Sequence, residues 1–202
     1  MELLIGRIAE KKILSEALAS SSSELLAVFG RRRVGKTFLI RSVFQKQLIF
    51  ELSGVHDANA SEQLLNFSKA IADALGSGLT PAAPKNWTEA FWQLREFAAP
   101  ILKKRKAVIF FDEFPWLSSH KSGFLSAFEY FWNQWASQQP NLIVTICGSA
   151  ATWMIKKVVN SEGGLHNRLT RKIRLLPFTL HETEQYLKSN NIHMDRYQML
   201  NI

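Results

Sequence analysis

Several kinds of residue are scarce in this 202-residue chain, and each scarcity excludes a class of protein. The one cysteine, Cys147, excludes an intrachain disulfide and a metal site built from several thiolates. Apolar runs such as Ala107–Phe111 and Leu142–Cys147 are far shorter than the ~18 residues that indicate a membrane span. The N-terminal residues do not form the basic and apolar pattern of a secretory signal. We therefore expect a cytoplasmic protein that does not enter a membrane.

Acidic residues are the minority charge. The chain has 17 Asp and Glu against 25 Lys and Arg, which gives a formal net charge of +8. Such a balance favours a polyanionic partner, which could be a nucleotide, a nucleic acid or an acidic protein surface. Charge alone does not choose among these three. The basic residues gather in four places, at Arg31–Arg33, Lys103–Lys106, Lys156–Lys157 and Arg168–Arg174.

Apolar residues make up 47% of the chain, and their spacing alternates between helix-like and strand-like along it. This alternation is typical of an α/β domain with a mostly parallel sheet. Strands are expected at Leu25–Phe29, Leu48–Leu52, Ala107–Phe111, Leu142–Cys147 and Ile173–Leu176. Helices are expected at Ala9–Ala19, Thr37–Phe44, Ser61–Leu75 with Ser61 as its N-cap, Thr88–Phe97, Gly123–Ala136, Ala151–Val159 and Leu180–Leu187.

The segment from Gly30 to Thr37 reads Gly-Arg-Arg-Arg-Val-Gly-Lys-Thr and matches the pattern G-x-x-x-x-G-K-[ST] in full. It follows an expected strand and opens an expected helix, which is the context that the pattern requires. Glycines let consecutive backbone N–H groups surround a phosphate, and the following helix adds its positive end. Lys36 is placed to reach the β- and γ-phosphates, and the Thr37 hydroxyl is a ligand for Mg²⁺.

Two further polar positions follow expected strands. Asp112 and Glu113 end the run Val108–Phe111, where a carboxylate is costly unless it holds a metal or pairs with a charge. Asp112 is the candidate Mg²⁺ ligand, and Glu113 is the candidate base that orients and deprotonates water. Both could instead begin a solvated loop. Ser149 follows the next strand, and ligands in parallel sheets bind at the carboxyl ends of strands.

With these motifs the chain resembles the P-loop ATPases of the AAA+/STAND lineage, and within it the archaeal-type ATP-binding proteins. Leu4-Ile5-Gly6-Arg7 is similar to the family's N-terminal box, and Asp112-Glu113-Phe114-Pro115 to its acidic box. Cys147-Gly148-Ser149 resembles its sensor, and Gly163–Arg168 with Ile173–Phe178 resembles the approach to its helical lid. The resemblance implies a three-layer α/β/α sandwich with strand order 5-1-4-3-2, and ATP or ADP with Mg²⁺ as ligands.

The resemblance also implies roles for individual residues. It implies that Glu113, Lys36, Ser149 and Arg168 are catalytic and that Thr37 and Asp112 hold the metal. Arg168 would act either on the γ-phosphate of its own site or across a subunit interface. Its segment, Leu165-His166-Asn167-Arg168, departs from the family's usual L-Y-G-R, so the sequence does not decide between these two roles. The implied nucleotide-binding residues are Ile5, Gly6, Arg7, Gly30, Arg31, Arg32, Arg33, Val34, Gly35, Lys36, Thr37 and Phe38.

We expect residues 1–178 to form the ATPase core and residues 179–202 to begin a helical lid that is cut short. The predicted function is a Mg²⁺-dependent ATP hydrolase that works as a conformational switch for DNA, a protein partner or a further C-terminal domain, with homo-oligomers as one arrangement. Hydrolysis by this chain alone is expected to be weak or absent if a lid or neighbour completes the site.

Three alternatives remain open. A GTPase would carry an [NT]-K-x-D motif, which the sequence lacks. A P-loop kinase would need an acceptor pocket, and a basic nucleic-acid-binding module would hold its nucleotide structurally. The side chains of Arg31–Arg33 are interpreted as solvated, with recruitment of nucleotide or a partner as the sharper alternative. Trp116 is the aromatic residue that best suits contact with a partner or nucleic acid.

Overall fold

Five parallel strands form one sheet in the order β2-β3-β4-β1-β5. The computed structural model describes residues 4–76, 78, 80–119, 121–160, 164–165, 167–194 and 196–199. The strands are β1 (Glu24–Phe29), β2 (Leu48–Ser53), β3 (Ala107–Asp112), β4 (Leu142–Gly148) and β5 (Arg171–Arg174). Read from the other edge, this is the predicted order 5-1-4-3-2, which is therefore confirmed.

The central strands are apolar along nearly their whole length because helices cover both faces of the sheet. Every residue of β1, β3 and β4 is buried, whereas the edge strands β2 and β5 are only partly buried. Strand β4 pairs with β1 on one side and with β3 on the other. The carboxyl ends of these three strands therefore meet at one edge of the sheet.

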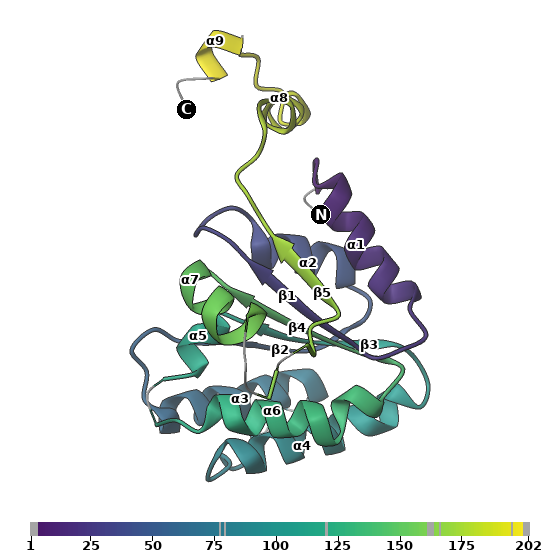
Figure 1. Ribbon diagram of the computed structural model, residues 1–202, viewed down its shortest axis with the longest axis vertical. Helices are drawn as coiled ribbons and strands as arrows, with labels where there is room; N and C mark the ends of the chain where they lie inside the picture. Colours follow the sequence, from purple (N-terminus) through teal and green to yellow (C-terminus); the bar gives the residue numbers. More distant parts are fainter. Residues whose placement is uncertain are drawn as a thin grey trace.

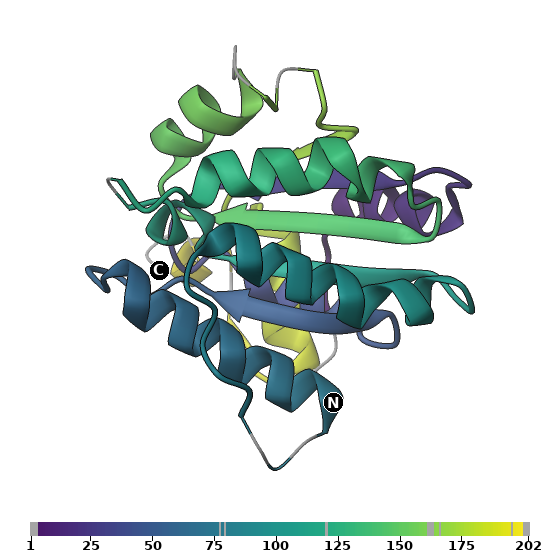
Figure 2. The same cartoon turned by 90° about the horizontal axis from the view of Figure 1, so that it is seen from below.

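Helices lie in two layers (Figure 1). Helices α1 (Ile8–Ala19) and α2 (Lys36–Phe44) lie on one side of the sheet. Helices α3 (Ala60–Leu75), α4 (Trp87–Leu102) and α6 (Phe124–Gln134) lie side by side on the other, as Figure 2 shows. The predicted three-layer sandwich is confirmed.

The remaining helical segments are shorter. They are α5 (Phe114–Leu117), α7 (Ala151–Met154, continued by a π-helical turn at Ile155–Val159), a 3-10 turn at Ala136–Gln138, α8 (Leu180–Ser189) and α9 (Arg196–Met199).

The two faces of the sheet have different cores. The face under α3, α4 and α6 is rich in aromatic rings, which pack edge-to-face at centroid distances such as 4.9 Å for Phe114 and Phe128. The face under α1 and α2 is mainly aliphatic, with Leu14, Leu39 and Ile40 at its centre. Aromatic pairs add about 0.5–1.5 kcal/mol each beyond their buried area. The aromatic face therefore anchors the layer that does not carry the phosphate-loop helix α2.

Some predicted boundaries are wrong. Helix α3 is capped by Asn59 and not by Ser61, because Asn59 and Glu62 form a reciprocal capping box. Strand β5 runs from Arg171 to Arg174 and not from Ile173 to Leu176, because its pairing with β1 begins at the contact of Leu26 with Arg171. Helix α4 continues past the predicted end through Pro100, which lies in its last turn.

Helix α8 projects beyond the three layers and carries α9 with it (Figure 1). No residue of α8 is buried, although Thr179 and Glu182 cap its first turn with a capping box. In the part of the chain that the structure describes, no helix is long and apolar enough to cross a membrane.

Candidate functional site

The loop from Gly30 to Gly35 joins β1 to α2 in a conformation that needs its glycines. A Cβ atom on Gly30 would lie 2.1 Å from the carbonyl oxygen of Leu175, so no larger residue fits there without displacing the backbone. Arg33 and Gly35 have φ values of 65° and 88°, in the left-handed region. Such turns direct successive backbone N–H groups into one concavity, which binds anions. Lys36 then opens α2, whose positive end faces the same place.

Lys36 is buried, with only 6% of its surface exposed. Its Nζ donates to the carbonyl oxygens of Gly30 and Arg31 at 3.2 and 2.9 Å. The ammonium group therefore lies across the inside of the loop rather than in solvent. A buried cation beside the loop backbone and a helix N-terminus makes a strong site for a polyanion.

Thr37, in the first turn of α2, and Asp112, at the end of β3, are hydrogen-bonded to each other. The Thr37 Oγ1 donates to Asp112 Oδ2 at 2.6 Å, and Asp112 lies at the end of β3 with 7% exposure. Hydroxyl and carboxylate oxygens are ligands that Mg²⁺ accepts, and Mg²⁺ usually takes its other ligands from water and phosphate. The described residues contain no cluster of three or more His, Cys, Asp or Glu side chains suited to a metal. The donor set thus fits Mg²⁺ shared with a phosphate, not an ion held by protein alone.

Glu113 has φ 43° and ψ 45°, a left-handed conformation that is strained for a residue with a side chain. Its Oε2 accepts from Ser149 Oγ at 2.8 Å and from the Ser149 N–H at 3.2 Å. The pairing of β3 with β4 brings these two residues together. Ser149 therefore holds the Glu113 carboxylate beside Asp112.

Two cavities lie on either side of the loop and share Arg33, Gly35 and Phe38. The first, of about 530 Å³, is the more polar of the two and is lined by Arg32, Arg33, Gly35, Lys36, Thr37, Phe38, Glu113 and Trp116. The second, of about 520 Å³, is mostly apolar and is lined by Leu4, Ile5, Arg7, Arg33, Val34, Gly35, Phe38, Leu39, Pro177, Phe178 and Tyr186. One end suits phosphates and the other suits a flat aromatic base.

Arg7 connects the second cavity to α8. Its guanidinium lies 4.4 Å above the Phe178 ring and donates to the Val34 carbonyl oxygen at 3.2 Å. The Arg7 N–H donates to Glu182 Oε1 at 2.9 Å. Partial burial would raise the pKa of Glu182, but the hydrogen bonds from Thr179 and Arg7 outweigh it and lower that pKa. The charged carboxylate is therefore the form that fastens α8 to Arg7.

Sequence reasoning missed the residues of the second cavity that follow β5, namely Pro177, Phe178 and Tyr186, and the Arg7–Glu182 contact. The capping box of Thr179 and Glu182 is visible in the sequence and indicates where α8 begins. The spacing of this capping box does not indicate that the Glu182 side chain also accepts a hydrogen bond from Arg7, because Arg7 and Glu182 are 175 residues apart in the sequence.

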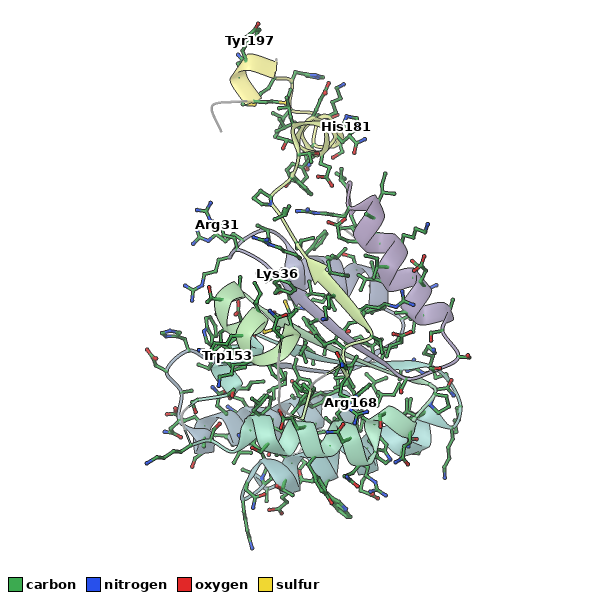
Figure 3. The ribbon with its side chains drawn as sticks, in the orientation of Figure 1. Arg31, Lys36, Trp153, Arg168, His181 and Tyr197 are labelled. Atoms are coloured by element: carbon green, nitrogen blue, oxygen red, sulfur yellow. The ribbon has the colours of Figure 1, made fainter. Side chains whose placement is uncertain are left out.

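The structure gathers almost all the predicted site residues at the carboxyl ends of the strands; Arg168 is the exception. Thr170 donates to Leu25 at the start of β1, so Arg168 lies at the amino end of β5. Figure 3 shows Arg168 near α6, well separated from Lys36 and Arg31. In this structure Arg168 does not lie in the site of its own chain, and its role across a subunit interface stays a prediction. Gly163 and His166 of the same motif lie outside the described residues.

Comparison with known sequences identifies a family model that matches residues 4–191, described as an ATPase domain predominantly from Archaea. A curated relative, Uncharacterized protein MJECL04 of Methanocaldococcus jannaschii, is 27% identical over 188 residues. The match covers 91% of this chain but 38% of that protein. The chain thus spans well under half the length of this relative.

Solved structures share the fold at low sequence identity. The Walker-type ATPase PABY2304 of Pyrococcus abyssi gives a TM-score of 0.65 at 18% identity, covering 96% of this chain and 61% of that one. Cdc6p of Pyrobaculum aerophilum gives 0.63 at 16% identity, covering 93% and 50%. The Aeropyrum pernix ORC2 protein, in ADPNP–ADP complexes, gives 0.60 at 15% identity, covering 93% and 53%.

Proposed function

Because this chain belongs to the family of ATPase domains found predominantly in Archaea, P-loop ATPases of the AAA+ lineage, we propose that it binds ATP with Mg²⁺ and hydrolyses it as a conformational switch. One observation carries the proposal. Thr37 Oγ1 lies 2.6 Å from Asp112 Oδ2, beside the phosphate loop that encloses the Lys36 ammonium. A hydroxyl, a carboxylate and a buried ammonium at the mouth of a helix N-terminus are the groups that a Mg²⁺–triphosphate needs.

Each polar residue has one task in this proposal. The loop N–H groups and Lys36 bind the β- and γ-phosphates, and Thr37 with Asp112 holds the metal. Mg²⁺, when bound, neutralises charge on the phosphate oxygens. Glu113 orients a water and accepts its proton; the water oxygen bonds to the γ-phosphorus, and the bond from that phosphorus to the bridging oxygen breaks. The products are ADP and inorganic phosphate.

The apolar cavity takes the base. Phe178 and Tyr186 supply rings that can stack on adenine, and the Arg7 guanidinium packs on the Phe178 ring at 4.4 Å. The Aeropyrum pernix ORC2 protein, which has the same fold, forms ADPNP–ADP complexes, and this supports nucleotide binding by a chain of this fold.

The switch works through α8, which we take as the start of a lid. It is fastened to Arg7, and Arg7 lies against both the phosphate loop and the base cavity. Filling that cavity changes the surroundings of Phe178 and hence the position of α8. Arg168, at the far end of the sheet, is free to serve the site of a neighbouring copy in a homo-oligomer. The effector is DNA, a protein or a further domain.

Calorimetric titration with ATP, ADP and GTP, with and without Mg²⁺, tests the proposal. Wild-type protein should bind ATP and ADP in preference to GTP, and Lys36→Ala should abolish binding while the circular dichroism spectrum is unchanged. Lys46→Ala, an exposed lysine just beyond α2, is the matched control and should bind as wild type does. Binding by Lys36→Ala, or a preference for GTP, would contradict the proposal.

Hydrolysis is tested separately with Glu113→Gln. This variant should bind ATP with near wild-type affinity and lose turnover by about 100-fold or more, because the group that accepts the proton is gone. Unchanged turnover would remove Glu113 from this role.

A further inference from the structure

Arg32 and Trp116 touch across the polar cavity, although one belongs to the phosphate loop and the other to α5. The Arg32 guanidinium carbon lies 5.3 Å from the centre of the Trp116 ring. Both side chains line the cavity that also contains Lys36, Thr37 and Glu113. A cation over an indole face is a favourable pair, and more so when the pair is desolvated.

Trp116 is itself held in place. Its backbone N–H donates to the Glu113 carbonyl oxygen at 2.8 Å, and its ring meets His56 edge-on at a centroid distance of 5.2 Å. The backbone of Trp116 is therefore hydrogen-bonded to the strained turn that presents the Glu113 side chain, and the indole packs against His56. Arg32 is otherwise an exposed loop residue, so this ring is what orders its guanidinium over the cavity.

The remaining arginines of the region are placed differently. Arg31 points outward from the tip of the loop in Figure 3, and only its carbonyl oxygen is used, by Lys36. Arg168 lies at the opposite end of the sheet. Lys36 approaches the cavity from inside the loop, whereas Arg32 and Trp116 approach it from the side of Glu113.

We propose that Arg32 is an arginine supplied by the chain's own phosphate loop to the terminal phosphate of ATP, and that Trp116 is the positioning residue that holds it. This inference rests on the proposed function and names a group that the motif alone does not assign. Guanidinium binds two phosphate oxygens at once and keeps its charge at every physiological pH. As the bond to the bridging oxygen breaks, Arg32 stabilises the negative charge on the oxygens of the transferring phosphate.

The first test uses binding and requires no turnover. ADP and the analogue ADPNP differ in the terminal phosphate, so Arg32→Ala should weaken ADPNP by about tenfold or more while ADP changes less than about twofold. Arg32→Lys should restore part of the preference for ADPNP. Arg95→Ala is the matched control, because Arg95 also lies over an indole, that of Trp135 at 6.0 Å on the far side of the molecule.

Trp116 is tested by substitution of its ring. Trp116→Phe, which keeps an aromatic face, should retain most of the ADPNP preference, and Trp116→Ala should lose it with ADP affinity unchanged. In turnover assays Arg32→Ala should lower kcat by about 100-fold. Trp116→Ala should also lower kcat while its ADP affinity and the fraction of protein that binds ADP stay at the wild-type values, a combination that simple loss of folding would not produce.

Two results would overturn the inference. If Arg32→Ala leaves the ratio of ADPNP to ADP affinity unchanged, Arg32 does not reach the terminal phosphate. If Trp116→Ala leaves that ratio at the wild-type value, Trp116 does not position Arg32. Both results presuppose that the wild-type protein binds nucleotide, which separates them from the failure of the proposed function: wild-type protein that binds neither ADP nor ADPNP overturns both.

Discussion

The sheet domain and helix α8 are held in place by different forces. The sheet domain encloses two apolar cores in which rings such as Phe111, Phe114 and Phe128 are fully buried. Helix α8 has no buried residue and keeps Leu180 and Tyr186 exposed at 39% and 42%. It is linked to the domain by the Arg7–Glu182 hydrogen bond, and its Tyr186 ring contacts Phe178, on the segment that leaves β5, at a centroid distance of 6.1 Å.

This difference indicates which part of the molecule can respond to a ligand. Burying one large apolar side chain contributes about 1.5–3 kcal/mol, so the sheet domain is stabilised many times over. A hydrogen bond to a charged group contributes about 1.5–3 kcal/mol, and α8 depends on very few of them. Ligand binding of ordinary strength can therefore shift α8 without disturbing the sheet. The four predictions that follow test this contrast.

The largest effect is expected in the aromatic core. Phe128→Ala should lower the free energy of unfolding by about 3–5 kcal/mol, because it leaves a cavity among closely packed rings. Urea denaturation followed by circular dichroism measures this. Tyr130→Ala, two residues along the same helix and 64% exposed, should change the same quantity by less than about 0.5 kcal/mol. Equal losses in the two variants would contradict the description of this core.

Tyr186→Ala should show the opposite behaviour. The ring is half-exposed on α8 and lines the base cavity, so its removal should leave the unfolding free energy nearly unchanged. We expect ATP affinity to fall about three- to tenfold, the loss of one aromatic contact. Calorimetry on the folded variant checks this, and an unaltered affinity would show that Tyr186 does not contact the base.

A smaller, local effect is expected at Glu182. Its folded pKa is lowered, so its contribution to stability is present above the unfolded value near 4.5 and is lost as pH falls through the folded pKa. Glu182→Gln at neutral pH should mimic that loss and speed hydrogen exchange of the Arg7 amide about tenfold. Mass spectrometry at residue resolution measures the rate. An Arg7 amide that exchanges at the same rate in Glu182→Gln and in wild type at the same neutral pH would contradict the Arg7–Glu182 link. Lys188→Gln, on an exposed part of α8, is the control.

The smallest effect is expected at Cys147. Burial raises the pKa of its thiol well above the usual value, and the neighbouring Asp112 raises it further. The thiol should therefore stay neutral and unreactive toward iodoacetamide at pH 8 in folded protein, and react promptly in urea. Rapid labelling of the native chain would show that the sheet opens beneath the site.

The phosphate loop and the acidic box could be recognised from the sequence because each is a short run whose chemistry lies in its own spacing. The same is true of the parallel-sheet class, since β1, β3 and β4 are continuous apolar runs. The N-cap of α3 was predicted wrongly because two candidate capping residues lie close together in the sequence. Ser61 stands directly before the apolar residues, but Asn59 and Glu62 share a reciprocal box and begin the helix instead.

Contacts between distant segments were decided by the tertiary structure alone. Ser149 holds Glu113 because β4 lies beside β3, and Glu182 reaches Arg7 because the chain leaving β5 crosses the phosphate loop. Arg32 meets Trp116 for the same reason, and Arg168 is carried away from the site by the direction of β5. A sequence specifies a loop or helix through neighbours a few residues apart, and the phosphate loop could therefore be predicted from the sequence. Partners separated by tens to hundreds of residues meet only when the whole sheet has formed.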